Sequence, residues 1–360
     1  MPVEEGYINV TIDGQEVELL VDSNAWGIEL IDGRWYEAKY GKGACDEPHA
    51  GCYFCKEESP CIFKKELVRK SSFADGTWIK GIERTGSLEL GGHETTNFTF
   101  TVFRIIEWVG SRPHGFFGLA GLSRTSNLFQ PWPGQEGLLD ALVRHNVIGR
   151  QSYTVRTDTT QVSEYVTGQL TLGGTVEKSK NTKYTFPQFT YDPRFYRAIT
   201  SVWVSSLKLF DPRMNLTTKE RPVGLHSSSF LATMDTGANG VYLPYEGLLE
   251  DIERELKKEM KGKGYREKQI GEVWRRDEWG VVYVKEEAFD SLPVLGFQLG
   301  EGDYSIPIKI HPMHYCADTL QGEYLIFVQQ TNYSVLGTPF FRAYSVHVDF
   351  TSKEIALLEN

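Results

Sequence analysis

The sequence has little of what marks membrane and nucleic-acid-binding proteins, since its 360 residues contain no long apolar run and no extended basic region. No stretch approaches the roughly 20 apolar residues that a membrane-spanning helix requires, so no membrane partner is predicted. The formal net charge of -10 argues against a nucleic-acid partner, because neutralising phosphates requires a basic face. The start, Met1 to Glu5, lacks the basic and apolar regions of a signal peptide, so we expect either a mature form or a protein that is never secreted.

The motifs of several enzyme classes are missing as well. The sequence has no Gly-x-Ser-x-Gly elbow of a serine hydrolase, no P-loop and no Gly-x-Gly-x-x-Gly dinucleotide fingerprint. These absences argue against a serine hydrolase and against nucleotide-dependent chemistry. We expect neither a cofactor nor a catalytic metal.

The residues that are present favour a body of short β-strands. The 35 Gly and 15 Pro, with many Thr, Val, Tyr and Phe, are typical of strands joined by tight turns. Helical periodicity is rare and appears at 137–146 and 245–260. A chain of 360 residues exceeds the size at which one hydrophobic core usually stops growing, so two lobes are expected. The Lys-, Asn- and Thr-rich stretch 175–185 breaks the pattern, and we predict an N-terminal lobe at 1–178 and a C-terminal lobe at 179–360.

Four of the five cysteines lie in one short stretch, at Cys45, Cys52, Cys55 and Cys61. Two local disulfides that staple a loop are one interpretation, and a zinc knuckle is the other. We favour the disulfides, because the single Cys-x-x-Cys lacks the matching second pair that is usual in zinc sites. Cys316 has no obvious partner.

Sequons for N-glycosylation indicate where the protein is found. Such acceptors have meaning only in a secretory product. Together with the predicted disulfides they favour a secreted protein or one of the endomembrane lumen. The four sequons begin at Asn9, Asn97, Asn215 and Asn332.

A duplicated pattern carries the candidate chemistry. A predicted hairpin with an Asp-Gly turn leads into an apolar strand that ends at Asp22, and a second apolar run ends at Asp235. Each Asp is followed by a hydroxyl residue. About a hundred residues later each half has an apolar pair closed by glycine, Phe116-Phe117-Gly118 and Val335-Leu336-Gly337. The same elements in the same order at similar spacing are a much stronger signal than one Asp-Thr-Gly.

With these motifs the chain resembles the pepsin family of aspartic proteases over nearly its whole length. The family's Asp-Thr-Gly pattern is similar to Asp235-Thr236-Gly237, and an apolar position and a helix follow it. The closing segment 334–350 is similar to the family's C-terminal signature, with the final Phe and Asp interchanged. The resemblance implies a bilobal, all-β fold of two related β-barrel-like lobes with a few short helices.

The resemblance also implies an aspartic endopeptidase. A water activated by Asp22 and Asp235 would hydrolyse a bond of an extended peptide or protein substrate, and the protein would be a monomer. The hairpin 71–79 would be the flap that closes over the substrate. The residues that would support the two Asp are Ser23, Asn24, Thr236 and Gly237. The flap residues that would contact substrate are Phe73, Asp75, Gly76 and Thr77.

The first half departs from the family pattern at four positions. Asn24 replaces the Gly of Asp-Thr-Gly, which is the mildest exchange if the turn needs a positive φ. Ala25 replaces a Ser, Phe73 aligns with the family's flap Tyr, and Glu29 aligns with the Trp that hydrogen-bonds that Tyr. An alternative function is therefore a catalytically impaired pepsin-like protein that binds or inhibits a protein partner. A further alternative is a cleft recruited for a small molecule.

Overall fold

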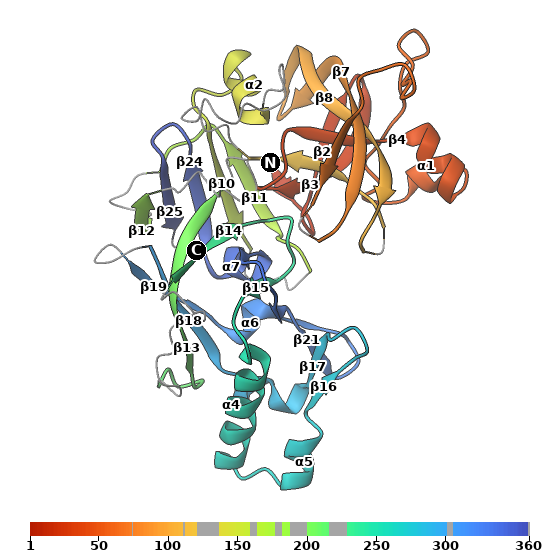
Figure 1. The fold of residues 1–360 in the computed structure, drawn as a ribbon. Helices are drawn as coiled ribbons and strands as arrows, with labels where there is room; N and C mark the ends of the chain where they lie inside the picture. Colours follow the sequence, from red (N-terminus) through yellow and green to blue (C-terminus); the bar gives the residue numbers. More distant parts are fainter. Residues whose placement is uncertain are drawn as a thin grey trace.

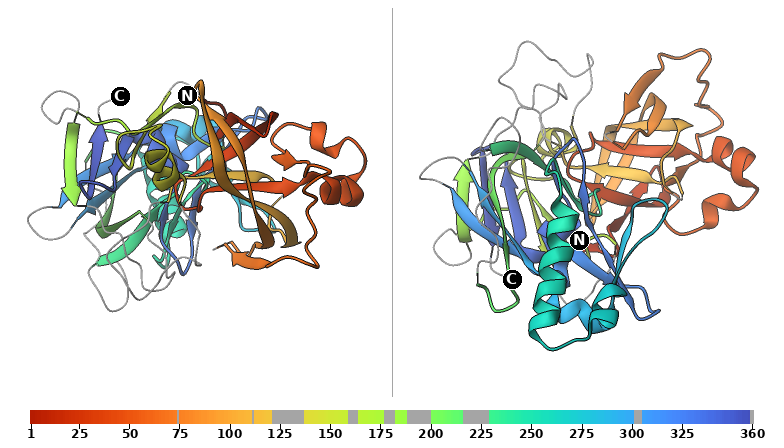
Figure 2. Two further views of the ribbon diagram at one scale, coloured as in Figure 1. Left: turned by 90° about the horizontal axis from the view of Figure 1, so that it is seen from above. Right: turned by 60° about the horizontal axis from the view of Figure 1, so that its bottom comes forward.

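The computed structural model describes residues 1–73, 75–110, 112–120, 137–158, 164–176, 182–187, 200–215, 229–300 and 305–358. The described chain is mostly β-structure arranged in two lobes (Figure 1). The red to orange strands of the first lobe lie to one side in both further views (Figure 2). The predicted bilobal, mostly β class is confirmed. No helix within the described ranges is long and apolar enough to cross a membrane.

The first lobe is built on one eight-stranded sheet. Its strand order is β2-β3-β9-β4-β8-β7-β6, with β5 beside β4, and an additional pairing of β2 with β7 closes it into a barrel. The strands are β2 (Tyr7–Ile12), β3 (Gln15–Asp22), β4 (Ile28–Asp32), β5 (Cys52–Tyr53), β6 (Arg69–Ser72), β7 (Trp78–Leu90), β8 (His93–Glu107) and β9 (Gly115–Gly118). The helical elements among them are α1 (Gly33–Tyr40) and the 3-10 turn η1 (Ala44–Asp46).

The second lobe contains a seven-stranded and a four-stranded sheet. The seven-stranded order is β19-β18-β13-β14-β23-β15-β22. Its strands are β13 (Ser201–Phe210), β14 (Ser229–Met234), β15 (Val241–Leu243), β18 (Val294–Leu299), β19 (Ile306–Ile310), β22 (Val328–Gln330) and β23 (Val335–Leu336). The four-stranded sheet consists of β16 (Trp274–Arg276), β17 (Val282–Lys285), β21 (Glu323–Ile326) and β20 (Cys316–Asp318). The helical elements are α4 (Leu248–Gly262), α5 (Glu267–Gly271), η2 (Glu286–Ser291), α6 (Pro312–Tyr315) and α7 (Thr338–Ala343).

A six-stranded sheet joins the two halves of the chain. It has the order β1-β11-β10-β24-β25-β12, and β10 pairs with β24 between the halves. Its strands are β1 (Pro2–Val3), β10 (Ser152–Thr157), β11 (Gly168–Leu172), β12 (Thr182–Pro187), β24 (Ser345–Asp349) and β25 (Glu354–Leu358). The predicted lobe boundary at 178 and 179 lies outside the described residues, and the boundary stays a prediction.

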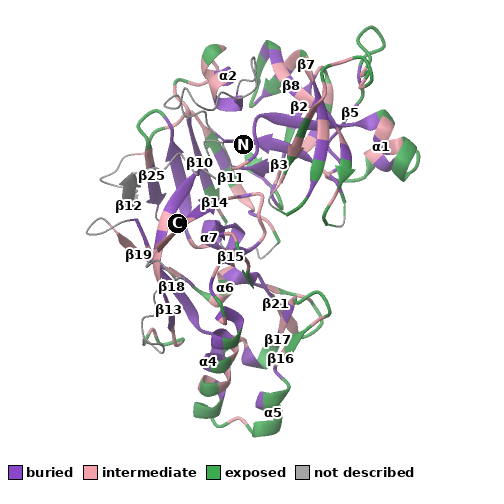
Figure 3. Cartoon of the chain, viewed as in Figure 1, coloured by how far each residue is buried: buried purple, intermediate pink, exposed green. Residues whose placement is uncertain are grey.

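The two predicted helices are present. The pattern at 137–146 forms α2 (Leu138–Arg144) and the pattern at 245–260 forms α4. Helix α4 begins at Leu248 because Gly247 has a φ of 80° and interrupts the helical backbone. Figure 3 shows both buried and exposed residues along α4, and the charged residues Asp251 and Glu255 are buried together with its apolar ones. The buried apolar residues of α4 are Leu248, Leu249, Ile252, Leu256 and Met260.

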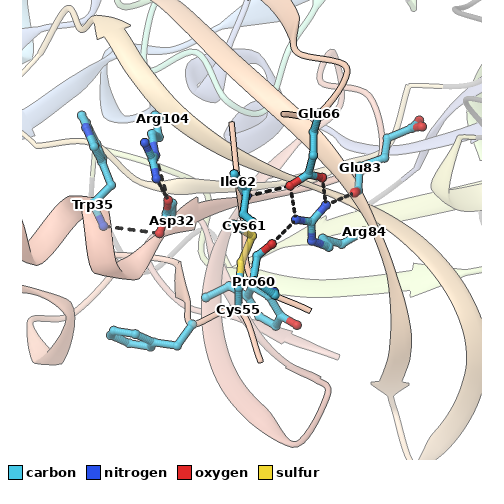
Figure 4. The surroundings of a disulfide bond; sticks show 12 residues. Asp32, Trp35, Cys55, Pro60, Cys61, Ile62, Glu66, Glu83, Arg84 and Arg104 are labelled. Carbon is cyan, nitrogen blue, oxygen red and sulfur yellow. Dashed lines mark hydrogen bonds and ion pairs between the residues drawn. A yellow bond between two sulfur atoms is a disulfide. The ribbon is translucent and has the colours of Figure 1, made fainter. Parts of the chain in front are cut away.

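Both predicted disulfides are present in the cysteine-rich loop. Cys45 pairs with Cys52 and Cys55 pairs with Cys61, so these four cysteines do not form a zinc knuckle. Figure 4 shows the second disulfide beside an ion pair that ties the loop to β7. Cys316 is free and buried in the second lobe.

The sequence duplication reappears as a duplicated strand arrangement. In the first lobe β9 runs parallel to β3 and antiparallel to β4, and in the second β23 runs parallel to β14 and antiparallel to β15. Gly118 and Gly337 lie where two segments of backbone cross at close range. A Cβ at Gly118 would lie 2.5 Å from the Ala25 carbonyl oxygen, and one at Gly337 would lie 2.3 Å from that of Ala238. Each apolar pair ends in glycine because the crossing leaves no space for a side chain.

We predict that Gly337→Ala lowers the free energy of unfolding by about 3 kcal/mol or more, because the added methyl overlaps two backbone carbonyl oxygens. The φ of Gly337 is -91°, so the cost arises from space and not from a left-handed backbone. Gly262→Ala is the matched control, since no atom lies within 4 Å of its Cβ position. It should change stability by less than about 1 kcal/mol, in the stabilising direction. Equal urea midpoints for the two variants would contradict this account of the crossing.

Candidate active site

The duplicated strands deliver two aspartates to one place. Asp22 is the last residue of β3, and Asp235 directly follows β14. Both line the same cavity, of about 1080 Å³, which is bordered by residues of both lobes. The structure therefore brings together the two carboxyl groups that the sequence placed 213 positions apart.

Reciprocal hydrogen bonds tie the loops that carry the two aspartates. The Ser23 backbone N–H donates to Thr236 Oγ1 at 3.0 Å, and the Thr236 N–H donates to Ser23 Oγ at 3.0 Å. The Ser23 hydroxyl donates to the carbonyl of Met234 at 3.0 Å, and the Thr236 hydroxyl donates to that of Val21 at 2.7 Å. Both residues are buried. These four bonds fix the distance between the two loops that carry the carboxyl groups.

The two carboxyl groups hydrogen-bond each other but have different backbone donors. Asp22 Oδ1 accepts from the N–H groups of Asn24 at 2.7 Å and Ala25 at 2.8 Å. Asp235 Oδ1 accepts from the Gly237 N–H at 2.9 Å. Burial, followed by the charge of Asp22, raises the pKa of the Asp235 carboxyl well above its ordinary value. Asp22 is therefore the better supported carboxylate and Asp235 the better place for a proton.

Asn24 and Gly237 occupy corresponding positions, and the structure corrects our expectation about their backbone. Neither residue has a positive φ. What requires glycine at 237 is space, because a Cβ there would lie 2.8 Å from Asp22 Cγ. At Asn24 a side chain is accommodated at the cavity wall, and its amide lowers the pKa of the Asp235 carboxyl.

The predicted flap is a hairpin at the edge of the cavity. β6 pairs with β7, and the Phe73 N–H donates to the Thr77 carbonyl at 2.9 Å. The carboxylate of Asp75 accepts from the Thr77 N–H at 2.8 Å, and Gly76 has a φ of 98° that suits the turn. Phe73, Asp75 and Thr77 line the cavity, whereas Gly76 does not. Ala74 lies outside the described residues.

Two of the positions that depart from the family pattern meet at one residue. The ring of Phe73 stacks on that of Phe116 with centroids 5.0 Å apart, and Glu29 is the neighbour of Phe116 in the β4–β9 pairing. Trp108 packs against Phe116 as well. An aromatic stack thus holds the flap at Phe73, which has no hydroxyl to donate.

Aromatic residues form much of the cavity wall, and most of them are not marked by any sequence motif. Tyr7 stacks on His49 at 3.9 Å and meets His114 edge-on. Burial lowers the pKa of His114 to about 4, so above that pH it borders the cavity as a neutral ring. The aromatic residues of the wall come from separate loops and strands, so no regular spacing in the sequence could have grouped them. The lining residues that sequence reasoning did not identify include Tyr7, His49, His114, Tyr165, Tyr242 and Tyr333.

No group of three or more metal-binding side chains was found in the described parts of the chain.

The comparisons with known proteins agree with the duplicated motifs. The family profile described as Eukaryotic aspartyl protease matches residues 35–359. This range includes Asp235 and the closing signature, and it begins after Asp22 and its altered loop. A comparison with curated proteins found no match.

We predict that Thr236→Val destabilises the protein by about 2 kcal/mol or more, because it leaves the buried Val21 carbonyl and Ser23 N–H without partners. The shape of the side chain is preserved, so the loss reports the hydrogen bonds. Thr96→Val on the exposed face of β8 is the control and should change stability by less than about 0.5 kcal/mol. Urea denaturation measures both. A loss for Thr236→Val no larger than the control would show that the hydroxyl link does not hold the loops.

Proposed function

The chain belongs to the eukaryotic aspartyl proteases, and from this premise we propose that it is an endopeptidase in which Asp22 and Asp235 activate a water. The observation that carries the proposal is the hydrogen-bonded contact of the two carboxyl groups at the cavity wall. The reciprocal bonds of Ser23 and Thr236 support it, because they hold the two groups in a fixed geometry.

The proposed reaction starts from a pair that carries one proton. Two carboxyl groups in contact cannot both ionise at low cost. They therefore share a proton, as membership of the family implies. Asp22, with two backbone donors, takes the role of the carboxylate, and Asp235 holds the proton. Asp22 removes a proton from the water as its oxygen attacks the carbonyl carbon, and Asp235 donates its proton to the carbonyl oxygen. The tetrahedral intermediate then breaks its C–N bond as Asp22 gives its proton to the nitrogen and Asp235 takes a proton from one hydroxyl of the intermediate, which leaves a carboxylic acid, an amine and the pair with one proton again.

The cavity, of about 1080 Å³ and lined by residues of both lobes, supports a peptide as substrate. It opens along both lobes, and the flap residues Phe73, Asp75 and Thr77 stand on one side of it. The hairpin would exclude water from bound substrate, which strengthens the electrostatic interactions at the carboxyl pair. An extended peptide is therefore the proposed substrate class.

We predict that the protein cleaves fluorogenic peptides between pH 3 and 6, and that Asp22→Asn and Asp235→Asn each lower kcat/KM by about 10²-fold to 10⁴-fold or more. Each change removes the group that holds or accepts the shared proton. Pepstatin should inhibit the wild-type protein. The control is Asp290→Asn. Asp290 is exposed and does not line the cavity, so this variant should keep full activity.

Two results would contradict the enzyme. One is a wild-type protein that cleaves no peptide while it binds pepstatin, which would indicate a cleft that binds without turnover. The other is cleavage that survives both substitutions, which would place the chemistry elsewhere.

We also infer that the protein folds in an oxidising compartment of the secretory route. Disulfides persist there, and the structure has two. The asparagines of all four sequons are exposed, as glycan transfer requires, although residues 216 and 217 of the third sequon lie outside the described part. The four are Asn9, Asn97, Asn215 and Asn332.

When the protein is expressed through a eukaryotic secretory route, it should therefore carry N-linked glycans. Endoglycosidase treatment should lower its mass, and Asn97→Gln should remove the mass of one glycan. Asn146→Gln, which changes an asparagine outside any sequon, should leave the glycan mass unchanged. A secreted product with no glycan at any of the four sites would contradict the inference.

A further inference from the structure

We propose that Asn239 is a positioning residue, which joins the loop of Asp235 to the segment 164–167 of the first half and so holds together two walls of the cavity beside the carboxyl pair. The inference rests on the proposed function, since it concerns how these walls would hold a peptide substrate. It adds a second connection between the two halves of the chain, at the cavity wall, to the buried hydroxyl link of Ser23 and Thr236.

The connection is a chain of two short hydrogen bonds. The Tyr242 hydroxyl donates to Asn239 Oδ1 at 2.5 Å, and Asn239 Nδ2 donates to Glu164 Oε1 at 2.5 Å. All three residues line the cavity. Burial raises the pKa of the Tyr242 hydroxyl, so it stays a donor throughout the acid and neutral range. Because this hydroxyl donates to the amide oxygen, the amide nitrogen is the end that is directed to Glu164.

The segment 164–167 is in turn fixed to strand β3, which ends at the first aspartate. The Gly6 N–H donates to the carbonyl of Val166 at 2.7 Å, and the Val21 N–H donates to the carbonyl of Gly6 at 2.8 Å. The packing there is close, since a Cβ at Gly6 would lie 2.6 Å from Tyr165 Cβ. A continuous path of contacts therefore leads from the residue before the first aspartate to the Asn239 amide.

The loop that carries Asn239 is held on its other side by the second lobe. The Ala238 carbonyl accepts from the Thr338 N–H at 2.8 Å, and the Gly240 carbonyl accepts from the Gly337 N–H at 3.1 Å. Both neighbours of Asn239 are thus anchored in one lobe, while its side chain bonds to the segment that is anchored to the other. A single side chain spans the two walls.

The titratable groups around the contact are tyrosines and acids. Burial and then the charge of Glu164 raise the pKa of the Tyr7 and Tyr165 hydroxyls, so both rings are neutral in the range where carboxyl groups titrate. Among the described residues Glu164 forms no ion pair, and the Asn239 amide is the donor that its carboxylate contacts. The acids that act on the tyrosines of this wall besides Glu164 are Glu5, Glu18, Asp22, Asp75 and Asp235.

Asn239→Asp tests the contact without any need for catalysis, because it places a second carboxyl group beside Glu164. Neighbouring carboxyl groups disfavour each other's ionisation, which raises their folded-state pKa above the unfolded value. Stability from a raised folded pKa is complete below the unfolded pKa, about 4, and is lost as pH rises through the folded pKa. The urea midpoint of Asn239→Asp should therefore fall relative to wild type between about pH 4 and pH 7.

The matched control is Asn146→Asp, which adds the same charge at an exposed position outside the cavity. Its urea midpoint should stay parallel to that of the wild type over this pH range. The decisive variant combines Asn239→Asp with Glu164→Gln, which exchanges the donor and the acceptor of the bond. The bond can then form in the opposite direction, so the pH-dependent fall should disappear.

Pepstatin affinity and peptide cleavage measure whether the contact positions the cavity walls. Asn239→Ala should weaken pepstatin binding and raise KM by about threefold to tenfold, with kcat within about twofold of wild type, because a preformed cavity is lost and the carboxyl pair is not. Glu164→Ala should have the same effect, and the two changes together should cost no more than either alone. Glu164→Gln retains an oxygen that can accept from Asn239, so it should recover most of the affinity that Glu164→Ala loses.

The outcomes separate this inference from the proposed function. Urea midpoints of Asn239→Asp that stay parallel to wild type, or a double variant no better than Asn239→Asp, would overturn the contact. Additive effects of the two alanine changes on pepstatin binding, or an unchanged KM, would overturn the positioning role even in an active peptidase. So would a loss in Glu164→Gln that is confined to peptides with Lys or Arg, since it would show recognition of charge. A pH-dependent fall that the exchange removes, in a protein that cleaves no peptide, would support the connection and overturn the endopeptidase.

Discussion

Two buried hydroxyl groups, those of Ser23 and Thr236, hold together the ends of strands from opposite halves of the chain. Each hydroxyl accepts from the backbone N–H of the opposite loop and donates to a carbonyl of the strand beneath it. Without either hydroxyl, the buried backbone groups that it contacts would lack a partner, because water does not reach them in the folded structure. The contact of the two carboxyl groups, and the raised pKa of Asp235 that follows from it, depend on this link.

The sequence predicted much of this arrangement because the chain repeats it. Two apolar runs that end in Asp, each followed by an apolar pair and glycine, mark the two crossings, and the structure has the same strand pairings in both halves. The cysteine spacing predicted the local disulfides, and the periodicity at 245–260 predicted α4. That Asp22 and Asp235 act in catalysis stays a prediction, although the structure places them together.

Other features had no signal in the sequence. The six-stranded sheet joins β1 near the start of the chain to β11, and β10 to β24, so its pairings depend on contacts between distant segments. The cavity aromatics come from separate loops. For the loop at Asn24 the sequence pattern could not decide between backbone conformation and space, and in the structure space beside the opposite carboxyl group is the deciding factor. A distance between two loops cannot be obtained from the residues of either loop alone.

The flap shows how two departures from the family pattern can compensate each other. Phe73 has no hydroxyl that could accept a hydrogen bond from an indole N–H, and Glu29 has no indole to donate one, yet both are neighbours of Phe116. Stacking of Phe73 on Phe116, with Trp108 alongside, replaces a directional bond by apolar contact.

The central claim is that Asp22 and Asp235 share one proton, and ¹³C NMR titration of the carboxyl carbons tests it most directly. The account predicts that the signal of Asp235 titrates well above the ordinary range of aspartate in the wild-type protein, and that Asp22→Asn lowers its midpoint because the neighbouring charge is gone. Titration of Asp235 in the ordinary range, with a midpoint that Asp22→Asn leaves unchanged, would show that the two groups are independent and would contradict the shared proton.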